Sequence, residues 1–206
     1  MSQMIDKKTY KIGDKNFYHT KHKKRQIILA GSLRNGNNYY VHQKNKKMGK
    51  AKDWNTFTIT REGVIHQHFD PACYTDFMGI KEVDKHSISV VLENMGMVFY
   101  DFESNQYLNW IHEECGEDDI YEQNWKNSRY WEVYPETQFL ATVELCEYLC
   151  KKYRIPLDSL GFNAYHEDTA RFEGIVCRSN FDSDYNDLNP SFSFKAFLNE
   201  IGIDYE

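Results

Sequence analysis

Short apolar runs bounded by turn residues recur through the first half of the chain, and runs of this length are typical of β-strands. RQIILA (25–30) stands before a Gly-Ser turn and predicts a buried strand. WNTFTIT (54–60) and GVIHQHFD (63–70) are joined by the turn residues REG and predict a β-hairpin. HSISVVLEN (86–94) and MVFYDFE (97–103) predict two further strands that pair with each other.

The pattern changes to a helical period in the second half. Between residues 135 and 154, apolar side chains recur at spacings of three and four residues, which places them on one face of a helix. The members of this face are Phe139, Leu140, Val143, Cys146, Leu149, Cys150 and Tyr153. Pro135 suits the first helical position. Shorter helices are expected at 37–46 and about 191–200, and the aromatic, acidic stretch at about 104–134 is expected to form an inserted loop.

Strands that alternate with helices predict an α/β fold, with a central mixed β-sheet flanked by helices. The length of 206 residues suits one domain with an ample core, so we expect residues 1–206 to form a single domain. No stretch approaches the roughly 18 uninterrupted apolar residues of a membrane helix. The first residues carry charge but no apolar segment of the kind found in secretory signals. We therefore expect a cytoplasmic protein with no membrane partner.

The net charge of −6 conceals a segregation of charge along the chain. Residues 1–61 hold 15 Lys and Arg against 3 Asp and Glu, whereas the remainder holds 10 against 28. Most of the basic residues lie between 21 and 52, in KHKKR and QKNKKMGKAK. Segregation of this kind is typical of a protein with an anionic partner, and a solvated basic surface explains it equally well. Residues 21–52 are accordingly a candidate surface for a protein partner.

One histidine pair has the spacing of a metal motif. His66 and His68 are two residues apart on a predicted strand, so their side chains share one face, and His166 or Glu173 is the candidate third ligand. Packing in the core is the favoured interpretation, because a zinc site needs at least three protein ligands. The five cysteines show no CxxC spacing, which argues against a disulfide framework or a zinc finger.

Five segments, spread over roughly residues 10 to 198, follow one another in a characteristic order. They are KRQIILAGS (24–32), FTITREGVIHQHFD (57–70), HSISVVLENMG (86–96), RYWEVYPETQ (129–138) and FEGIVCRSNFDSDYNDLNPSF (172–192). This order resembles the type 2 N-acetylmuramoyl-L-alanine amidases, the zinc hydrolases related to peptidoglycan recognition proteins, and is most similar to the phage endolysin branch. The resemblance implies an amidase-like (PGRP-like) fold and an origin connected with peptidoglycan cleavage.

The resemblance also implies that the zinc site has lost most of its ligands. The family has zinc-binding histidines at the positions of Ala30 and Arg178, and an aspartate or cysteine that is kept here as Asp187. A family lysine that stabilises the oxyanion aligns with Tyr185. Alanine donates no lone pair, and the permanent cation of Arg178 repels zinc and can pair with Asp187 instead. We therefore expect no zinc cofactor and no hydrolysis.

A cleft without zinc can still bind. We expect it to hold a small anionic ligand, either a muropeptide or other peptidoglycan fragment or a nucleotide-type signal. The expected ligand-binding residues are Arg178, Tyr185, Asp187, Trp54, Asn55, Thr56 and Ala30. Two alternatives stay open: a structural or interaction protein of a phage, acting in the virion or in host takeover, and an active peptidoglycan amidase with a rebuilt metal site. A phage origin would place the protein in the host cytoplasm or the virion.

Overall fold

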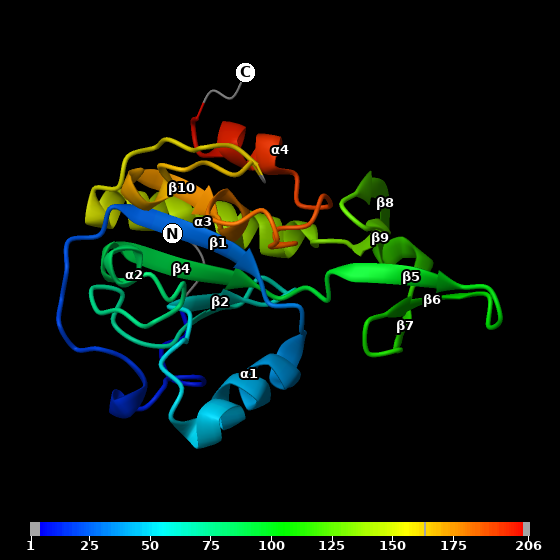
Figure 1. Ribbon diagram of the computed structural model, residues 1–206, viewed down its shortest axis with the longest axis horizontal. Coiled ribbons are helices and arrows are strands. Elements are labelled where there is room, and N and C mark those ends of the chain that lie inside the picture. Colours follow the sequence, from blue (N-terminus) through cyan, green and yellow to red (C-terminus); the bar gives the residue numbers. More distant parts are fainter. Residues whose placement is uncertain (1–4, 163, 204–206) are drawn as a thin grey trace.

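A five-stranded sheet forms the centre of the computed structural model, which describes residues 5–162 and 164–203 (Figure 1). The strand order is β10-β1-β4-β2-β3. The first four strands in this order run parallel and β3 is antiparallel to β2, so the predicted mixed sheet is confirmed. The strands are β1 (Gln26–Gly31), β2 (Phe57–Ile59), β3 (Ile65–Gln67), β4 (Ser87–Leu92) and β10 (Gly174–Cys177).

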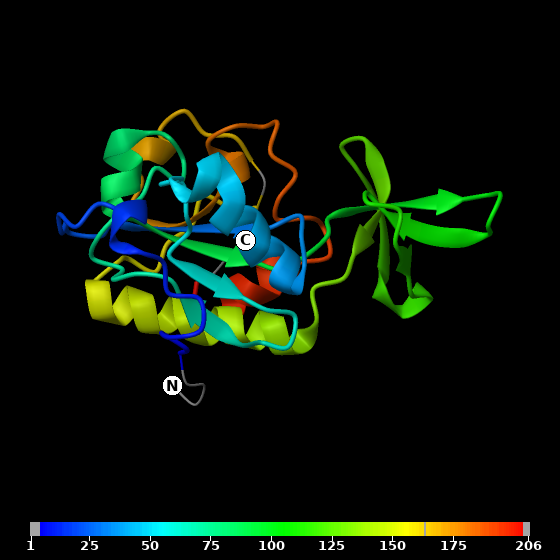
Figure 2. The same cartoon turned by 90° about the horizontal axis from the view of Figure 1, so that it is seen from below.

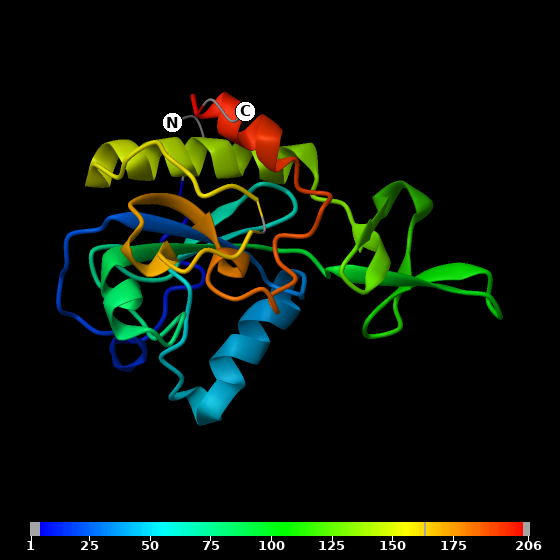
Figure 3. The same ribbon diagram turned by 45° about the horizontal axis from the view of Figure 1, so that its top comes forward.

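Helices cover both faces of this sheet (Figure 3). Helices α3 (Glu136–Tyr153) and α4 (Phe194–Glu200) lie on one face, and α1 (Gly36–Asn45) and α2 (Lys81–His86) lie on the other. Short 3-10 turns complete the fold at η1 (Asp14–Asn16), η2 (Lys46–Gly49), η3 (Glu117–Asp119), η4 (Thr169–Arg171) and η5 (Arg178–Asn180). No helix in the described part of the chain has the length and apolar character needed to cross a membrane.

The alternation of side chains along β1 divides the core between the two faces. Ile27 and Leu29 are fully buried in the cluster that contains the apolar residues of α3 and α4. Ile28 packs instead with Val83 of α2, and Ala30 lies in a separate cluster with Tyr39 of α1. A run of six buried residues is therefore what a strand covered on both faces requires.

Helix α3 confirms the predicted helix and refines its ends. Pro135 is the residue before the first helical position, and Arg154 ends the helix in the left-handed region, with φ 57°. Most of the predicted apolar face is buried, including Cys146 and Cys150, which are free thiols in the core. Leu140 departs from the expectation, since it is 50% exposed at the edge of this face.

A second sheet projects from the body beyond the end of β4 (Figure 2). Its order is β7-β6-β5-β9-β8 and all its pairs are antiparallel. Its strands are β5 (Met97–Asp101), β6 (Gln106–Asn109), β7 (Glu114–Cys115), β8 (Ile120–Trp125) and β9 (Ser128–Glu132). We call residues 97–132 the small sheet.

The small sheet corrects two sequence-based expectations. The stretch 104–134 is largely β-structure rather than a loop, and 97–103 pairs with β6 and β9 rather than with 86–94. A pairing between 97–103 and 86–94 is impossible because β4 is already hydrogen-bonded to β1 on one side and to β2 on the other. The strand pattern of 104–134 was hidden in the sequence, because the alternating side chains of this stretch are mostly aromatic or acidic rather than aliphatic.

Polar contacts fix the small sheet to the body. The carboxylate of Glu132 accepts a hydrogen bond from Asn35 Nδ2 at 3.0 Å and lies 3.2 Å from Arg61 Nη1. Arg61 also contacts Asp119 at 2.8 Å. On the other side, Lys126 Nζ donates to the carbonyl of Ser183 at 2.6 Å. The small sheet is thus tied to the segments that follow β1, β2 and β10.

Candidate functional site

A buried ion pair joins the segment that follows β10 to the end of β1. Arg178 Nε and Nη2 lie 2.8 and 2.6 Å from Asp187 Oδ2, so the pair predicted from the sequence is present. The same carboxylate oxygen accepts the Gly31 N–H at 2.8 Å, and Arg178 Nη2 also donates to the Gly31 carbonyl at 3.0 Å. Asp187 is 3% exposed, so its charge depends on these donors for stabilisation.

Gly31 allows the close approach on which this network depends. A Cβ atom at this position would lie 3.1 Å from the Tyr134 hydroxyl and 3.2 Å from Asp187 Cβ. These distances are tighter than ordinary packing permits, so a larger residue would push Asp187 away from the strand. The short sequence AGS at the end of β1 therefore serves the ion pair.

Aromatic rings surround the Arg178 guanidinium. Its central carbon lies 4.8 Å from the ring centroid of Tyr185 and 5.7 Å from that of Phe77. Tyr185 thus contacts Arg178 through its ring, a cation–π arrangement that holds the guanidinium in place. The hydrogen bonds to Asp187 and Gly31 use Nε and Nη2, so among the described residues Nη1 is the edge left for another acceptor.

The residues at the positions of the implied zinc ligands do not fit a catalytic zinc. Ala30 is fully buried in an apolar cluster, beside its β4 partner Val91, and offers no lone pair. Arg178 brings a permanent positive charge. Oδ2 of Asp187 already accepts hydrogen bonds from the Gly31 N–H and from Arg178 Nε, and lies 2.6 Å from Arg178 Nη2. A zinc ion needs at least three neutral or anionic donors around one point, and this set supplies one carboxylate.

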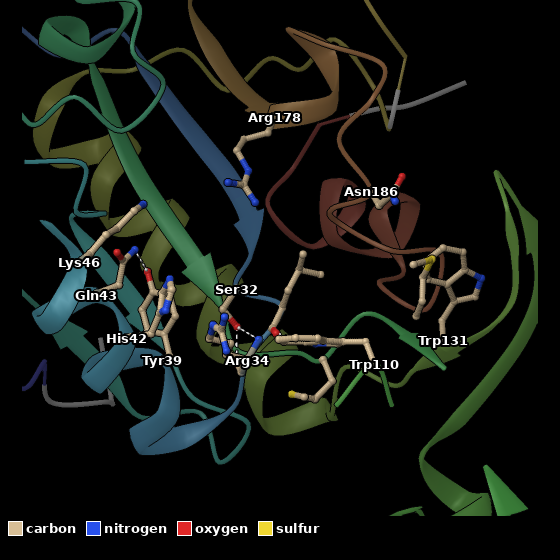
Figure 4. Close-up of a pocket in the computed structure, with 13 residues that line it drawn as sticks. Ser32, Arg34, Tyr39, His42, Gln43, Lys46, Trp110, Trp131, Arg178 and Asn186 are labelled. Atoms are coloured by element: carbon tan, nitrogen blue, oxygen red, sulfur yellow. Dashed lines mark hydrogen bonds between the residues drawn. The ribbon is translucent and has the colours of Figure 1, made fainter. Parts of the chain in front are cut away.

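A cavity of about 400 Å³ opens beside this network, and we call it the Arg178 cavity (Figure 4). It is lined by the segment after β1, by α1, by the small sheet and by the loop that follows β10. Its lining residues are Ser32, Leu33, Arg34, Tyr39, His42, Gln43, Lys46, Met95, Met97, Trp110, Trp131, Arg178 and Asn186. This set contains three permanent cations and a histidine but no carboxylate, a composition that favours an anionic occupant.

The three cations of the Arg178 cavity differ in how far they are already neutralised. Lys46 pairs with Asp53 at 2.5 Å, and Arg178 pairs with Asp187. Arg34 has no carboxylate within ion-pair distance among the described residues. Burial, together with the charges of Arg34 and Lys46, lowers the pKa of His42. His42 is therefore neutral at pH 7, and the positive potential comes chiefly from Arg34 and the open edge of Arg178.

Several predicted ligand-binding residues lie outside the Arg178 cavity. Asn55 is fully buried, accepts a hydrogen bond from the Tyr39 hydroxyl and donates to Thr58 Oγ1 at 2.8 Å. Thr56 is also buried, with its backbone N–H bonded to Ser89 Oγ at 2.9 Å. Trp54 lines a different cavity, between the N-terminal segment and α1. Together with Ala30, these residues form the packing behind the cavity rather than its wall.

Among the residues that line the Arg178 cavity, the sequence predicted only Arg178, and Arg34 and Trp110 are two of those it missed. Arg34 directly follows β1, and ligand sites of parallel sheets lie at the carboxyl ends of strands, so its position was a usable signal. Trp110 comes from the small sheet, and nothing local in the sequence indicates that it reaches the end of β1. Its Nε1 nevertheless donates to the Leu33 carbonyl at 3.0 Å.

His66 lies on β3 and His68 just after it, and both side chains make contacts within the fold. His68 is fully buried, and its two ring nitrogens lie 2.8 Å from Thr58 Oγ1 and 2.8 Å from the Tyr10 carbonyl. Burial lowers the pKa of His68 to about 4. His66 Nδ1 lies 3.2 Å from a carboxylate oxygen of Asp6. Across residues 5–162 and 164–203, no group of three or more metal-ligating side chains comes together.

The basic segment 21–52 is only partly a free surface. Lys24 is 1% exposed and donates to the carbonyls of Cys73 and Lys85 at 2.7 and 2.8 Å. Burial lowers the pKa of Lys24 to about 8. Lys21 pairs with Asp70 at 2.9 Å. Four lysines of this segment are exposed and make no ion pair within the described structure, namely Lys23, Lys44, Lys47 and Lys50. A protein partner for this segment stays a prediction.

Comparisons with known proteins identify the family and the fold of this chain. The sequence profile of the N-acetylmuramoyl-L-alanine amidase family matches residues 20–179, so the chain belongs to this family. A search of curated proteins found no match.

Solved structures of amidases share the fold at low sequence identity. The N-acetylmuramoyl-L-alanine amidase LysC from Clostridium intestinale URNW is 11% identical, with a TM-score of 0.57 over 98% of this chain and 100% of its own. A mutant of PlyL is 12% identical, with a TM-score of 0.59 over 97% and 98%. AmiD from E. coli, in complex with anhydro-N-acetylmuramic acid-L-Ala-D-gamma-Glu-L-Lys, is 11% identical, with a TM-score of 0.59 over 91% of this chain and 60% of its own.

Proposed function

We propose that this chain is a non-catalytic member of the amidase family that binds a small anionic ligand in the Arg178 cavity. The observation that carries the proposal is the Arg178–Asp187 pair, which stands where the family resemblance implies two of the zinc ligands. With the cation of Arg178 at this position, a site that would bind a metal ion becomes a site that binds an anion. The proposal includes a phage origin and an action in the host cytoplasm or the virion.

The loss of hydrolysis follows from the chemistry of the replaced positions. Amide hydrolysis by this family depends on a metal that lowers the pKa of a bound water and polarises the carbonyl. Arg178 and Arg34 are permanent cations and cannot accept a proton from water at neutral pH. Tyr185 packs against the guanidinium through its ring. None of these groups supplies a nucleophile, so the cavity is built for binding.

The charge of the cavity sets the class of ligand. AmiD was solved with a muropeptide that contains muramic acid and γ-glutamate, and a fragment of this kind carries carboxylates. A phosphate-bearing small molecule satisfies the same cations. The open Nη1 edge of Arg178 and the unpaired Arg34 can each donate to carboxylate or phosphate oxygens.

Titration calorimetry tests the proposal with inorganic phosphate and with a purified muropeptide as probes. We expect the wild type to bind at least one of them, and Arg178→Ala/Asp187→Asn to bind it at least about tenfold more weakly, since a charge-assisted hydrogen bond is lost. The double variant removes the cation without leaving a buried anion. Arg171→Ala changes an exposed arginine that lines no part of the cavity, and this variant should bind the probe like the wild type.

A parallel assay addresses catalysis. Purified protein supplied with zinc should release no peptide from peptidoglycan, and metal analysis should find no stoichiometric zinc. Zinc-dependent release of peptide from muramic acid would overturn the proposal, as would anion binding that is unaffected by the loss of Arg178.

A further inference from the structure

Trp110 is held at the mouth of the Arg178 cavity by two contacts with the segment that follows β1. Its Nε1 donates to the Leu33 carbonyl at 3.0 Å, and its ring centroid lies 5.0 Å from the Arg34 guanidinium carbon. The residue is nevertheless 41% exposed. An indole that is oriented by a hydrogen bond and still open to solvent is a preformed stacking surface.

Apolar side chains also line the cavity. They are Leu33, Met95 and Met97, and Met97 is itself 40% exposed. Figure 4 shows Arg178 and Trp110 reaching the cavity from different segments of the chain. The cavity therefore offers hydrogen-bond donors at the Arg178 end and a flat aromatic surface with apolar neighbours at the Trp110 end.

We infer that the ligand of this cavity carries a planar aromatic ring beside its anionic group, as a mononucleotide does, and that the ring stacks on Trp110. The inference rests on the proposed function and narrows its ligand class. A muropeptide also has anionic groups, and its sugar ring can pack on an indole through C–H groups, but it has no planar aromatic ring to stack on Trp110. The volume of about 400 Å³ suits a small molecule of mononucleotide size.

The stacking partner of Trp110 would also meet the charge of Arg34. The Arg34 guanidinium lies over one face of the indole, so a nucleobase would pack either on the other face of the ring or on the outer side of the guanidinium, and both contacts are favourable. The phosphate would then meet Arg178 through its open Nη1 edge. Binding would connect the small sheet with the loop that follows β10, since each end of the ligand contacts a different segment.

Calorimetry with a set of simple probes tests the inference: inorganic phosphate, adenosine, adenosine monophosphate and a purified muropeptide. We expect adenosine monophosphate to bind about tenfold or more tightly than phosphate, in the range that base–aromatic stacking contributes. Trp110→Leu should remove this advantage and leave the affinity for phosphate unchanged. Trp110→Phe retains a ring and should keep most of the advantage. Phe102→Leu alters an aromatic residue that is 87% exposed at the β5–β6 turn and should have no effect.

The possible outcomes distinguish failure of the stacking on Trp110 from failure of anion binding itself. Phosphate or muropeptide binding that requires Arg178, without any gain for adenosine monophosphate, would overturn the stacking inference and leave the proposed function standing. A gain for adenosine monophosphate that survives in Trp110→Leu would also overturn it. Failure of every anionic probe to bind, or binding indifferent to Arg178, would overturn the proposed function itself.

Discussion

Removal of Arg178 should destabilise the protein more than removal of the whole ion pair. In Arg178→Ala, the carboxylate of Asp187, whose side chain is 5% exposed in the wild type, loses its cation and retains the Gly31 N–H as its remaining donor within the pair's network. Breaking a buried pair by removing one partner costs about 3–5 kcal/mol. Because the Arg178 side chain is 20% exposed, solvent reaches one side of the pair, and we expect a loss at the lower end, about 3 kcal/mol.

The double variant Arg178→Ala/Asp187→Asn provides the comparison. An amide at position 187 still accepts the Gly31 N–H through its oxygen but carries no charge that needs compensation. We therefore expect the double variant to recover about 1 kcal/mol or more of the loss, a coupling typical of groups in direct contact. Arg171→Ala, an exposed arginine, should stay within about 0.5 kcal/mol of the wild type.

Urea unfolding followed by tryptophan fluorescence measures these free energies, and thermal unfolding checks them. A loss of about 3 kcal/mol should lower the Tm by roughly 6–12 °C in a chain of this size. The reasoning is refuted if Arg178→Ala unfolds with a free energy within about 0.5 kcal/mol of the wild type. It is equally refuted if the free-energy loss of the double variant equals the sum of the losses of Arg178→Ala and Asp187→Asn, because the two residues would then have no coupling.

Two further predictions follow from the same structure. Burial lowers the pKa of Lys24 from 10.5 to about 8, so between these values the unfolded chain binds more protons and the unfolding free energy should rise with pH, by about 3 kcal/mol in total for this group. Lys24→Met should remove that rise relative to the exposed control Lys23→Met, and parallel curves for both variants in urea titrations would contradict the account. Ala30→His/Arg178→His/Tyr185→Lys should bind one equivalent of zinc in metal analysis, and adding Asp187→Ala should abolish it; a triple variant that folds without taking up zinc would show that the positions do not converge as the family resemblance implies.

The central sheet was predictable because its strands are apolar on both faces. Strands β1 and β4 are buried along their whole length and mostly apolar, with Gln26, Ser87 and Ser89 as the polar exceptions, which is typical of a parallel sheet covered on both faces. The small sheet lacked this signal, since its tyrosines Tyr100, Tyr107 and Tyr130 pack edge to face, with ring centroids 5.0 and 5.1 Å apart along the row, in a largely solvated layer. Aromatic residues among acids read as an irregular loop until the strand pairing is known.

The candidate site was predictable only where the chain itself supplies both partners. Arg178 and Asp187 are nine residues apart in one loop, and a buried arginine requires a carboxylate, so their pairing could be inferred from the sequence. The contact between Trp110 and Leu33 joins residues 77 positions apart and depends on how the small sheet is mounted. Asn55 was misplaced because its side chain turns inward to Tyr39 and Thr58, which a strand pattern does not reveal.

Under the proposed function, the Arg178 network takes the place of the metal in the amidase fold. In the family, as the resemblance implies, one zinc ion gathers side chains from the end of the first strand, from the segment after the last strand and from the loop beyond it. Arg178, Asp187 and the backbone of Gly31 join these same three segments through direct contacts of 2.6–3.0 Å. The cross-link that the metal would supply is thus made by protein groups alone. Under the proposed function, this scaffold needs no zinc to hold the three segments together, and the cation that stabilises it is the one that would face an anionic ligand.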